Sequence, residues 1–291
     1  MTHMRHLIIT GFLMLNAHFA AAAPVGNIGD RAIWNPGFFE NGGPFSIIAT
    51  LTANSQTNDL PVQKSRFNWA NPNTTPAETR AYSQTRRSRN TLDNLGIQIG
   101  IPLNDSAYVY SLIGASQSKI TLHYTDWTVS RSFSRVDTFT SGPDVYYGVG
   151  AAFVMLRETL ENHIPLTFGM TAQYLRYSFS DDQLKTKNVS YSCSLSEIQL
   201  GLCLSTNIGP YSPYLGAKAA SLTGEEDYMN KNDASAYFPE GFVHYTNDIT
   251  WFKNIGYFIG VSRNFNDMFS VGLEIKFGDE EGLGLTATTR F

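Results

Sequence analysis

Two short motifs in this chain combine a histidine with a nearby carboxylate, residues 123–126 (His-Tyr-Thr-Asp) and residues 244–248 (His-Tyr-Thr-Asn-Asp). A histidine within hydrogen-bond reach of an orienting carboxylate can act as a general base. Both motifs lie where a predicted strand meets a predicted loop, so the alternative is that they are ordinary solvated residues. The sequence has no metal-ligand spacing and no cofactor motif. We therefore predict no catalytic residues, no metal site and no cofactor.

A second group of polar residues alternates with apolar ones and could line the interior of a barrel. Glu274 and Lys276 are two positions apart on one face of a predicted strand, and Arg290 lies on the next predicted strand. We expect these three to form a charge cluster that either plugs the interior or lines a narrow pore. The full set of predicted lumen-lining residues is Gln98, Thr171, Gln173, Gln199, Glu274, Lys276 and Arg290.

The two cysteines, Cys193 and Cys203, lie ten residues apart on one predicted strand. At ~3.3 Å per residue they would be roughly 33 Å apart, whereas a disulfide needs Cα atoms within about 7 Å of each other. A bridge between them is therefore not expected. Two alternatives remain, buried thiols or an intermolecular disulfide, because an exported protein meets an oxidising compartment.

The segments that carry these residues show the period-2 alternation of strands. Residues 283–291 alternate between apolar and polar residues and end on Phe291, as the closing strand of an outer-membrane barrel commonly does. We predict Phe291 to be the barrel-closing residue. Nine similar segments precede this one, at residues 45–53, 92–102, 107–117, 144–154, 164–174, 191–204, 214–221, 250–262 and 268–277.

The connections between these ten segments alternate between long and short, apart from a short last one. Bacterial outer-membrane barrels have short periplasmic turns and long extracellular loops. Charged residues make up only 16% of the chain and lie mostly in the long connections. We predict an all-β antiparallel transmembrane β-barrel of about ten strands, or of twelve if the first long connection hides a hairpin. The alternative is a secreted soluble β protein.

The N-terminus has the composition of a secretory signal. Arg5 precedes a run over residues 7–23 that is apolar or small except for Asn16 and His18. We predict a cleaved signal peptide over residues 1–22, a periplasmic lead-in over residues 23–44 and the barrel over residues 45–291. A membrane-anchoring helix is the alternative, although the run is shorter than the ~20 residues that such a helix needs.

Two resemblances to known families follow from these residues. Residues 23–27 (Ala-Pro-Val-Gly-Asn) resemble the mature start of the chlamydial major outer membrane porin family, and Trp34 and Phe291 are similar in kind. That family has a larger barrel and many more cysteines. The resemblance implies a porin that stiffens the envelope through disulfides between chains, with Cys193 and Cys203 as candidates. The histidine motifs resemble in kind the His and Asp residues that omptin proteases use near the top of a ten-stranded barrel.

We therefore predict an outer-membrane β-barrel that lets small solutes diffuse passively, has a structural role in the envelope, or does both. Alternatives are a surface adhesin or loop-mediated interaction protein, whose arginines at residues 80–89 could hold an anionic sugar, and an omptin-like protease. The expected partners are outer-membrane lipid, the barrel-assembly machinery through the C-terminal strand, and further copies of the chain in a homo-oligomer. A net charge of −4 gives no indication of a nucleic-acid partner.

Overall fold

The computed structural model describes residues 27, 29–33, 46–70, 79–127, 132–160, 164–181, 189–230, 243–251, 255–278 and 280–291. The predicted signal peptide, residues 1–22, lies outside these ranges. No helix in the described part of the chain is long and apolar enough to cross a membrane.

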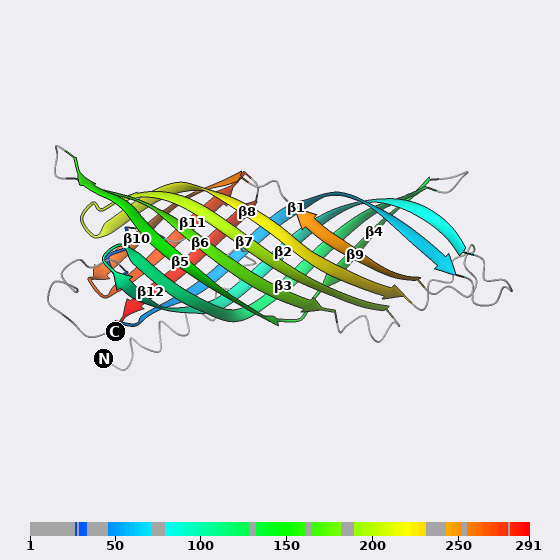
Figure 1. Ribbon diagram of the computed structural model, residues 1–291, viewed down its shortest axis with the longest axis horizontal. Coiled ribbons are helices and arrows are strands. Elements are labelled where there is room, and N and C mark those ends of the chain that lie inside the picture. The colour runs from blue at the N-terminus through cyan, green and yellow to red at the C-terminus, as the bar shows by residue number, and fades with distance from the viewer. Residues whose placement is uncertain are drawn as a thin grey trace.

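Ten strands pair antiparallel into a closed barrel (Figure 1). The ring closes because the last strand pairs with the first, and because the eighth element pairs with the tenth. The barrel strands are β1 (Ile48–Ala70), β2 (Thr79–Asn104), β3 (Ala107–Trp127), β5 (Asp144–Thr159), β6 (Pro165–Ser180), β7 (Val189–Thr206), β8 (Tyr211–Asn230), β10 (Ile255–Asn266), β11 (Phe269–Phe277) and β12 (Glu281–Arg290). The predicted transmembrane β-barrel of ten strands is confirmed.

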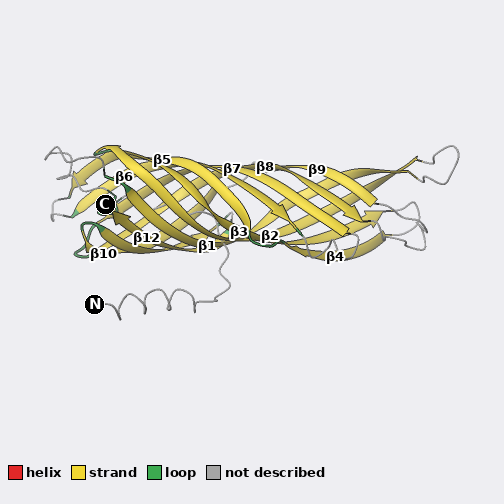
Figure 2. Ribbon diagram, turned by 90° about the horizontal axis from the view of Figure 1, so that it is seen from below, coloured by secondary structure: helices red, strands yellow, loops and turns green. Residues whose placement is uncertain are grey.

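Two further strands lie outside the ring of ten. β4 (Ser132–Thr140) pairs with the far part of β3, and β9 (Val243–Trp251) pairs with the far part of β8. Figure 2 shows both of them at the end of the elongated barrel that is opposite the C-terminus. The sheet thus has twelve strands, but the extra pair is not the hairpin inside the first long connection that we considered as an alternative. That connection instead continues β1 and β2 as one long paired extension.

Several strands extend into segments that the sequence led us to expect as loops. β7, whose predicted range of residues 191–204 is close to the observed one, shows how the pattern changes along such a strand. Near its start, Tyr191, Cys193 and Leu195 face the interior and are buried, whereas the serines between them point outward. Further along the same strand, Ile198 and Leu200 are exposed on the outside. The parity of the strand does not change, but the polarity of both faces is reversed.

This reversal marks where the strands leave the lipid. An exposed apolar belt is stable against lipid chains, whereas a strand in water must put its apolar side chains inside. The belt lies toward the short turns and includes Leu95, Ile97, Ile99, Ile113, Val145, Val149, Ile198, Leu200, Leu202, Leu215, Ile259 and Ile275. The far half encloses an apolar core of its own, made of Leu92, Leu112, Ile120, Phe139, Tyr146, Leu175, Tyr177, Phe179, Tyr191, Cys193, Leu195, Leu222, Tyr228 and Ile249.

The first and last barrel strands, β1 and β12, are joined up to the C-terminal residue. Phe291 donates its backbone N–H to the carbonyl of Ile47 at 2.9 Å and accepts the N–H of Ile47 at 3.3 Å. These two bonds continue the ten paired positions that join β1 to β12. The Phe291 side chain itself is 72% exposed, at the edge of the apolar belt.

Candidate functional site in the barrel interior

The structure places every predicted lumen-lining residue on the inward face of its strand. Gln98 is half-buried and donates from Nε2 to the Tyr108 hydroxyl at 3.1 Å. The other six are buried, namely Thr171, Gln173, Gln199, Glu274, Lys276 and Arg290. These side chains face the interior in the half of the barrel that carries the apolar belt, because the polar face of each strand is the one turned away from lipid.

A chain of hydrogen bonds spans four neighbouring strands of the interior wall, β3, β5, β6 and β7, with residues from all but β5. The Tyr110 hydroxyl on β3 donates to Gln173 Oε1 on β6 at 3.2 Å. Gln173 Nε2 donates to Gln199 Oε1 on β7, and Gln199 Nε2 donates to Glu197 Oε1 at 2.5 Å. Gln173 and Gln199, two of the three predicted glutamines, therefore belong to one network. Buried polar groups that are bonded to each other in this way hold the wall rigid.

Another part of the interior, along β8, β11 and the last turn, holds a cluster of charged side chains. Lys218 Nζ on β8 lies 2.5 Å from Glu280 Oε1. Lys276 Nζ lies 3.7 Å from both Glu280 Oε1 and Glu274 Oε1, and the Tyr214 hydroxyl donates to Glu274 Oε2 at 3.2 Å. Two lysines thus balance a pair of carboxylates in a place where an unbalanced charge would cost several kcal/mol.

Three further members of this interior were not among the predicted residues, although two of them carry a signal in the sequence. Glu197 and Lys218 lie on the inward parity of strands that we did predict, between apolar residues on the outward parity. Glu280 was assigned to the last turn. The chain turns inward after β11, where Gly278 has a φ of 105°, and this brings Glu280 into the barrel. Only glycine adopts such a φ without strain.

Arg290 does not join the cluster of Glu274 and Lys276 that we expected. The antiparallel register around the last turn pairs Glu274 with Gly284, whereas the backbone N–H of Arg290 donates to the carbonyl of Met268. Arg290 therefore lies near the short-turn end of the barrel, several residues along the strand from Glu274.

At that end, the structure places part of the predicted lead-in inside the barrel. Asn27 is buried and bonded to three strands. Its Nδ2 donates to the carbonyl of Ser212 and to Ser262 Oγ, both at 3.1 Å. Its Oδ1 accepts the hydroxyl of Ser205 at 2.8 Å. Sequence gives no local signal for these contacts, because their partners lie 178 to 235 residues away.

Two further contacts hold this N-terminal segment, residues 29–33, in place. The Ser270 hydroxyl donates to Asp30 Oδ2 at 2.6 Å, while Asp30 Oδ1 accepts the N–H of Ala32 within the segment at 2.9 Å. Burial raises the pKa of the Asp30 carboxyl, because the charged form loses its hydration there. A guanidinium nitrogen of Arg290 donates to the carbonyl of Ile33. The segment thus occupies the mouth of the barrel at its short-turn end.

Aromatic rings fill the space along the interior wall, and inward glycines make room for them. A Cβ at Gly216 would collide with the ring of Phe258, and one at Gly260 with the ring of Tyr214. The same relation joins Gly150 to the Tyr110 ring, Gly96 to the Tyr146 hydroxyl and Gly100 to the Tyr108 ring. The rings therefore lie against glycines of nearby strands.

Of the four residues considered for catalysis, the two whose side chains the structure describes lie on separate strands. His123 is exposed on β3 and Asp248 is exposed on β9. These strands are separated in the sheet by β5 to β8. The side chains of Asp126 and His244 lie outside the described residues, as do those of the basic cluster apart from the exposed Arg89.

The two cysteines both face the interior. Cys193 is buried in the apolar core of the far half, and Cys203 is buried near the short-turn end. No disulfide joins the two sulfurs. A disulfide to another chain would need one of these thiols to leave the barrel wall.

A closed antiparallel barrel with an apolar outer belt and polar, hydrogen-bonded inward residues is a transmembrane β-barrel of the outer-membrane type. No protein-family model matches the sequence, and no curated protein matches it. The similarity to the chlamydial porin family rests on residues 23–27, of which only Asn27 is described, and stays a prediction.

Among solved structures, the chain is similar to the transport unit of the autotransporter AIDA-I from Escherichia coli. The identity is 9% and the TM-score 0.34, over 98% of this chain and 96% of the other. It is also similar to the translocator domain of the autotransporter NalP from Neisseria meningitidis, with 9% identity and a TM-score of 0.33 over 100% and 97%. A third is an outer membrane channel from Pseudomonas putida F1, with 8% identity and a TM-score of 0.26 over 85% and 96%.

Proposed function

We propose that this protein is a filled outer-membrane barrel with a structural role in the cell envelope, which holds a stiff β-extension above the membrane surface. The observation that carries this proposal is the burial of the inward side chains. Glu274, Lys276 and Lys218 are only 1–2% exposed, although they point into the barrel at the level of the apolar belt, where an open pore would contain water. No enzymatic activity is included in the proposal.

The size of the barrel supports a filled interior. Barrels of about eight strands are just filled by side chains, whereas those with sixteen or more leave an aqueous channel. With ten strands in the ring, this barrel lies near the filled end. Its mouth at the short-turn end is occupied by the Asn27 and Asp30 contacts, which add a further barrier to solutes.

The extension beyond the belt supports a role at the surface. β1, β2, β3, β7 and β8 all continue past the outer limit of the apolar belt, and β4 and β9 widen the sheet there. Its outward side chains include Lys119, Glu225 and Asp248, all exposed. A charged outer wall around an apolar core is suited to water, so this part can contact other molecules without unfolding.

A gated narrow pore is the second candidate, and the charge cluster favours it. Burying ionised groups is costly, and apolar side chains of similar volume would often stabilise a purely structural barrel better. In a gated pore, Glu280 and the N-terminal segment would have to move away before ions could pass Lys218 and Lys276. This candidate retains the passive diffusion that the sequence suggested.

Single-channel recording of the refolded protein in a planar bilayer tests the proposal. Samples are first shown to be folded by their altered gel mobility before boiling. We expect folded wild-type protein to give no discrete conductance steps, and the double variant Asn27→Ala, Asp30→Ala to stay silent as well. Steps in the wild type would overturn the filled barrel. Steps seen only in the double variant would support the gated pore, and Glu274→Ala should then change its charge selectivity.

A further inference from the structure

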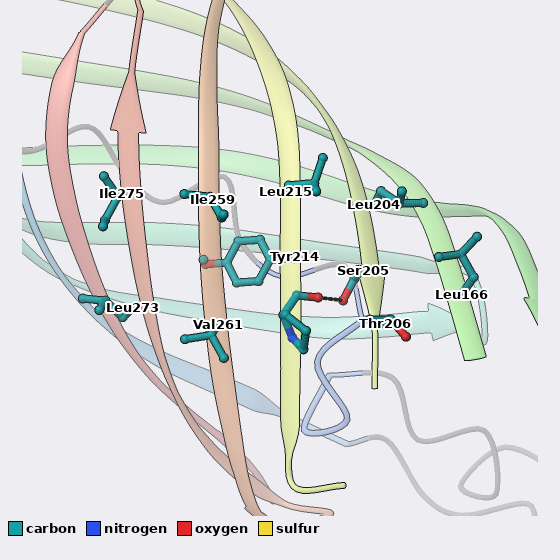
Figure 3. Close-up of a pocket in the computed structure, with 12 residues that line it drawn as sticks. Leu166, Leu204, Ser205, Thr206, Tyr214, Leu215, Ile259, Val261, Leu273 and Ile275 are labelled. Carbon is teal, nitrogen blue, oxygen red and sulfur yellow. Dashed lines mark hydrogen bonds between the residues drawn. The ribbon is translucent and has the colours of Figure 1, made fainter. Parts of the chain in front are cut away.

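The outer surface of the barrel carries an apolar groove at the short-turn end of the belt. It has a volume of about 480 Å³ and crosses β6, β7, β8, β10 and β11 (Figure 3). Side chains along it include Leu166, Leu204, Pro213, Leu215, Ile259 and Leu273. Most of these are outward-facing residues of the belt, so the groove opens toward lipid.

The register explains the shape of the groove. Leu204, Leu215 and Ile259 form one row across three neighbouring strands, because Leu204 pairs with Leu215 and Leu215 pairs with Ile259. In the next row toward the short turns, Pro213 pairs with Val261. The compact proline ring leaves a depression beside the larger leucine and isoleucine side chains.

A guanidinium group stands directly below this groove. Arg263 is the next outward residue after Val261 on β10 and pairs with Tyr211, the next outward residue after Pro213 on β8. Its guanidinium carbon lies 5.9 Å from the centroid of the Tyr211 ring and 4.9 Å from that of Phe265. All three side chains are exposed.

The two rings leave the hydrogen-bonding edge of this cation available. Cation–π contacts engage the flat face of a guanidinium, whereas its N–H groups lie in the plane and can pair with a phosphate in a bidentate manner. No described carboxylate makes an ion pair with Arg263. Tyrosine and other amphipathic aromatics mark the border between lipid and water, which is where a headgroup phosphate lies.

We propose that this groove and Arg263 form a binding site for one phospholipid of the periplasmic leaflet. One acyl chain lies along Leu204, Leu215 and Ile259, and the headgroup phosphate pairs with Arg263. The leaflet follows from the short turns, which lie on the periplasmic side in this class of barrel. The inference rests on the class of the protein and not on the function proposed above.

The fit of the groove alone does not select a lipid over its neighbours, because hydrocarbon tails already cover the belt. Selectivity comes from combining the groove with a cation placed one residue pair below it. At ~3.3 Å per residue, Arg263 lies roughly 7 Å along the strand from Val261. That is a suitable offset between the start of an acyl chain and its phosphate.

Native mass spectrometry of the refolded barrel, released from micelles containing phosphatidylglycerol or phosphatidylethanolamine, tests the site. We expect wild-type protein to retain one phospholipid. Arg263→Gln should lower the retained fraction about ten-fold, as expected for loss of one charge-assisted phosphate contact. Leu215→Trp should lower it as well, by filling the groove. Heat-dependent gel mobility verifies that each variant is folded.

Two matched variants serve as controls. Arg157→Gln removes an exposed arginine from β5 near the same end of the barrel, where it donates to the carbonyl of Asp105. Ile99→Trp adds a ring to the exposed face of β2, away from the groove. Both should retain lipid as the wild type does.

Three results would overturn the proposal. The first is retention by Arg263→Gln and Leu215→Trp that equals wild-type retention. The second is displacement of the phospholipid by millimolar inorganic phosphate, which would reveal a site for free anions only. The third is a wild-type dimer without bound lipid that Leu215→Trp dissociates, which would assign the groove to a second copy of the chain.

Discussion

Asn27→Ala should release the N-terminal segment from the mouth of the barrel without unfolding the barrel itself. The Asn27 carboxamide makes three hydrogen bonds to β7, β8 and β10, to Ser205, Ser212 and Ser262. Alanine can make none of them. The strands remain joined by their own ladders, so the loss falls on the docking of the segment.

The size of the effect follows from these bonds. A hydrogen bond within a protein contributes about 1 kcal/mol net, so that losing three costs about 3 kcal/mol of docking free energy. This corresponds to a change of about 150-fold in the equilibrium between docked and released segment. The remaining contacts, from Asp30 to Ser270 and from Arg290 to Ile33, are unchanged by the substitution.

Hydrogen exchange of the amides of Ala32 and Ile33 measures this equilibrium, because Ala32 is buried and Ile33 half-buried while the segment is docked, so that both amides meet solvent when the segment is released. We expect exchange about 150-fold faster in Asn27→Ala, and unchanged exchange in the barrel ladders. Asn104→Ala is the matched control, since Asn104 is exposed and accepts only a local bond from Ser106 in a turn. An Asn27→Ala variant with wild-type exchange at Ala32 and Ile33 would refute the docking of the segment through Asn27.

Two further predictions concern the interior. Lys218→Met should lower the free energy of unfolding by about 3–5 kcal/mol, because it leaves the buried Glu280 carboxylate without its nearest cation. Urea unfolding followed by gel mobility measures this, with Lys218→Arg as the control, and an unchanged midpoint would contradict the ion-pair geometry. Cys193 and Cys203 should both resist maleimide in the folded protein and react after denaturation. Labelling of folded protein, or disulfide-linked dimers on non-reducing gels, would show that a thiol reaches the surface.

The strands inside the lipid were predictable because one local rule decides them. In the belt, each strand is apolar toward lipid and polar toward the interior. Apolar residues such as Ile198 and Leu200 therefore mark the lipid-facing side of their strand without reference to any other strand. Their outward placement in the structure matches the face assigned from the alternation. The count of ten strands in the ring follows from the same pattern repeated along the chain.

The extensions were not predictable by that rule, because the apolar and polar faces of a strand exchange places once it leaves the lipid. Ser190 to Leu195 alternate as regularly as the belt does, but their apolar residues face inward. The segments around them are rich in polar residues and resemble loops unless the position of the membrane border is known. Pairing between distant strands, and not local hydropathy, extends β1, β2, β3, β7 and β8 beyond that border.

The sequence by itself determined the class of barrel, the number of strands in its ring and the face on which each belt residue lies, because alternation is a property of neighbouring residues. Only the tertiary structure decided which residues meet. Register placed Arg290 beside Ile33 and away from Glu274, and closure brought Asn27 against three strands far along the chain. Those contacts depend on strand pairing and on the length of each turn, and no short stretch of sequence contains that information.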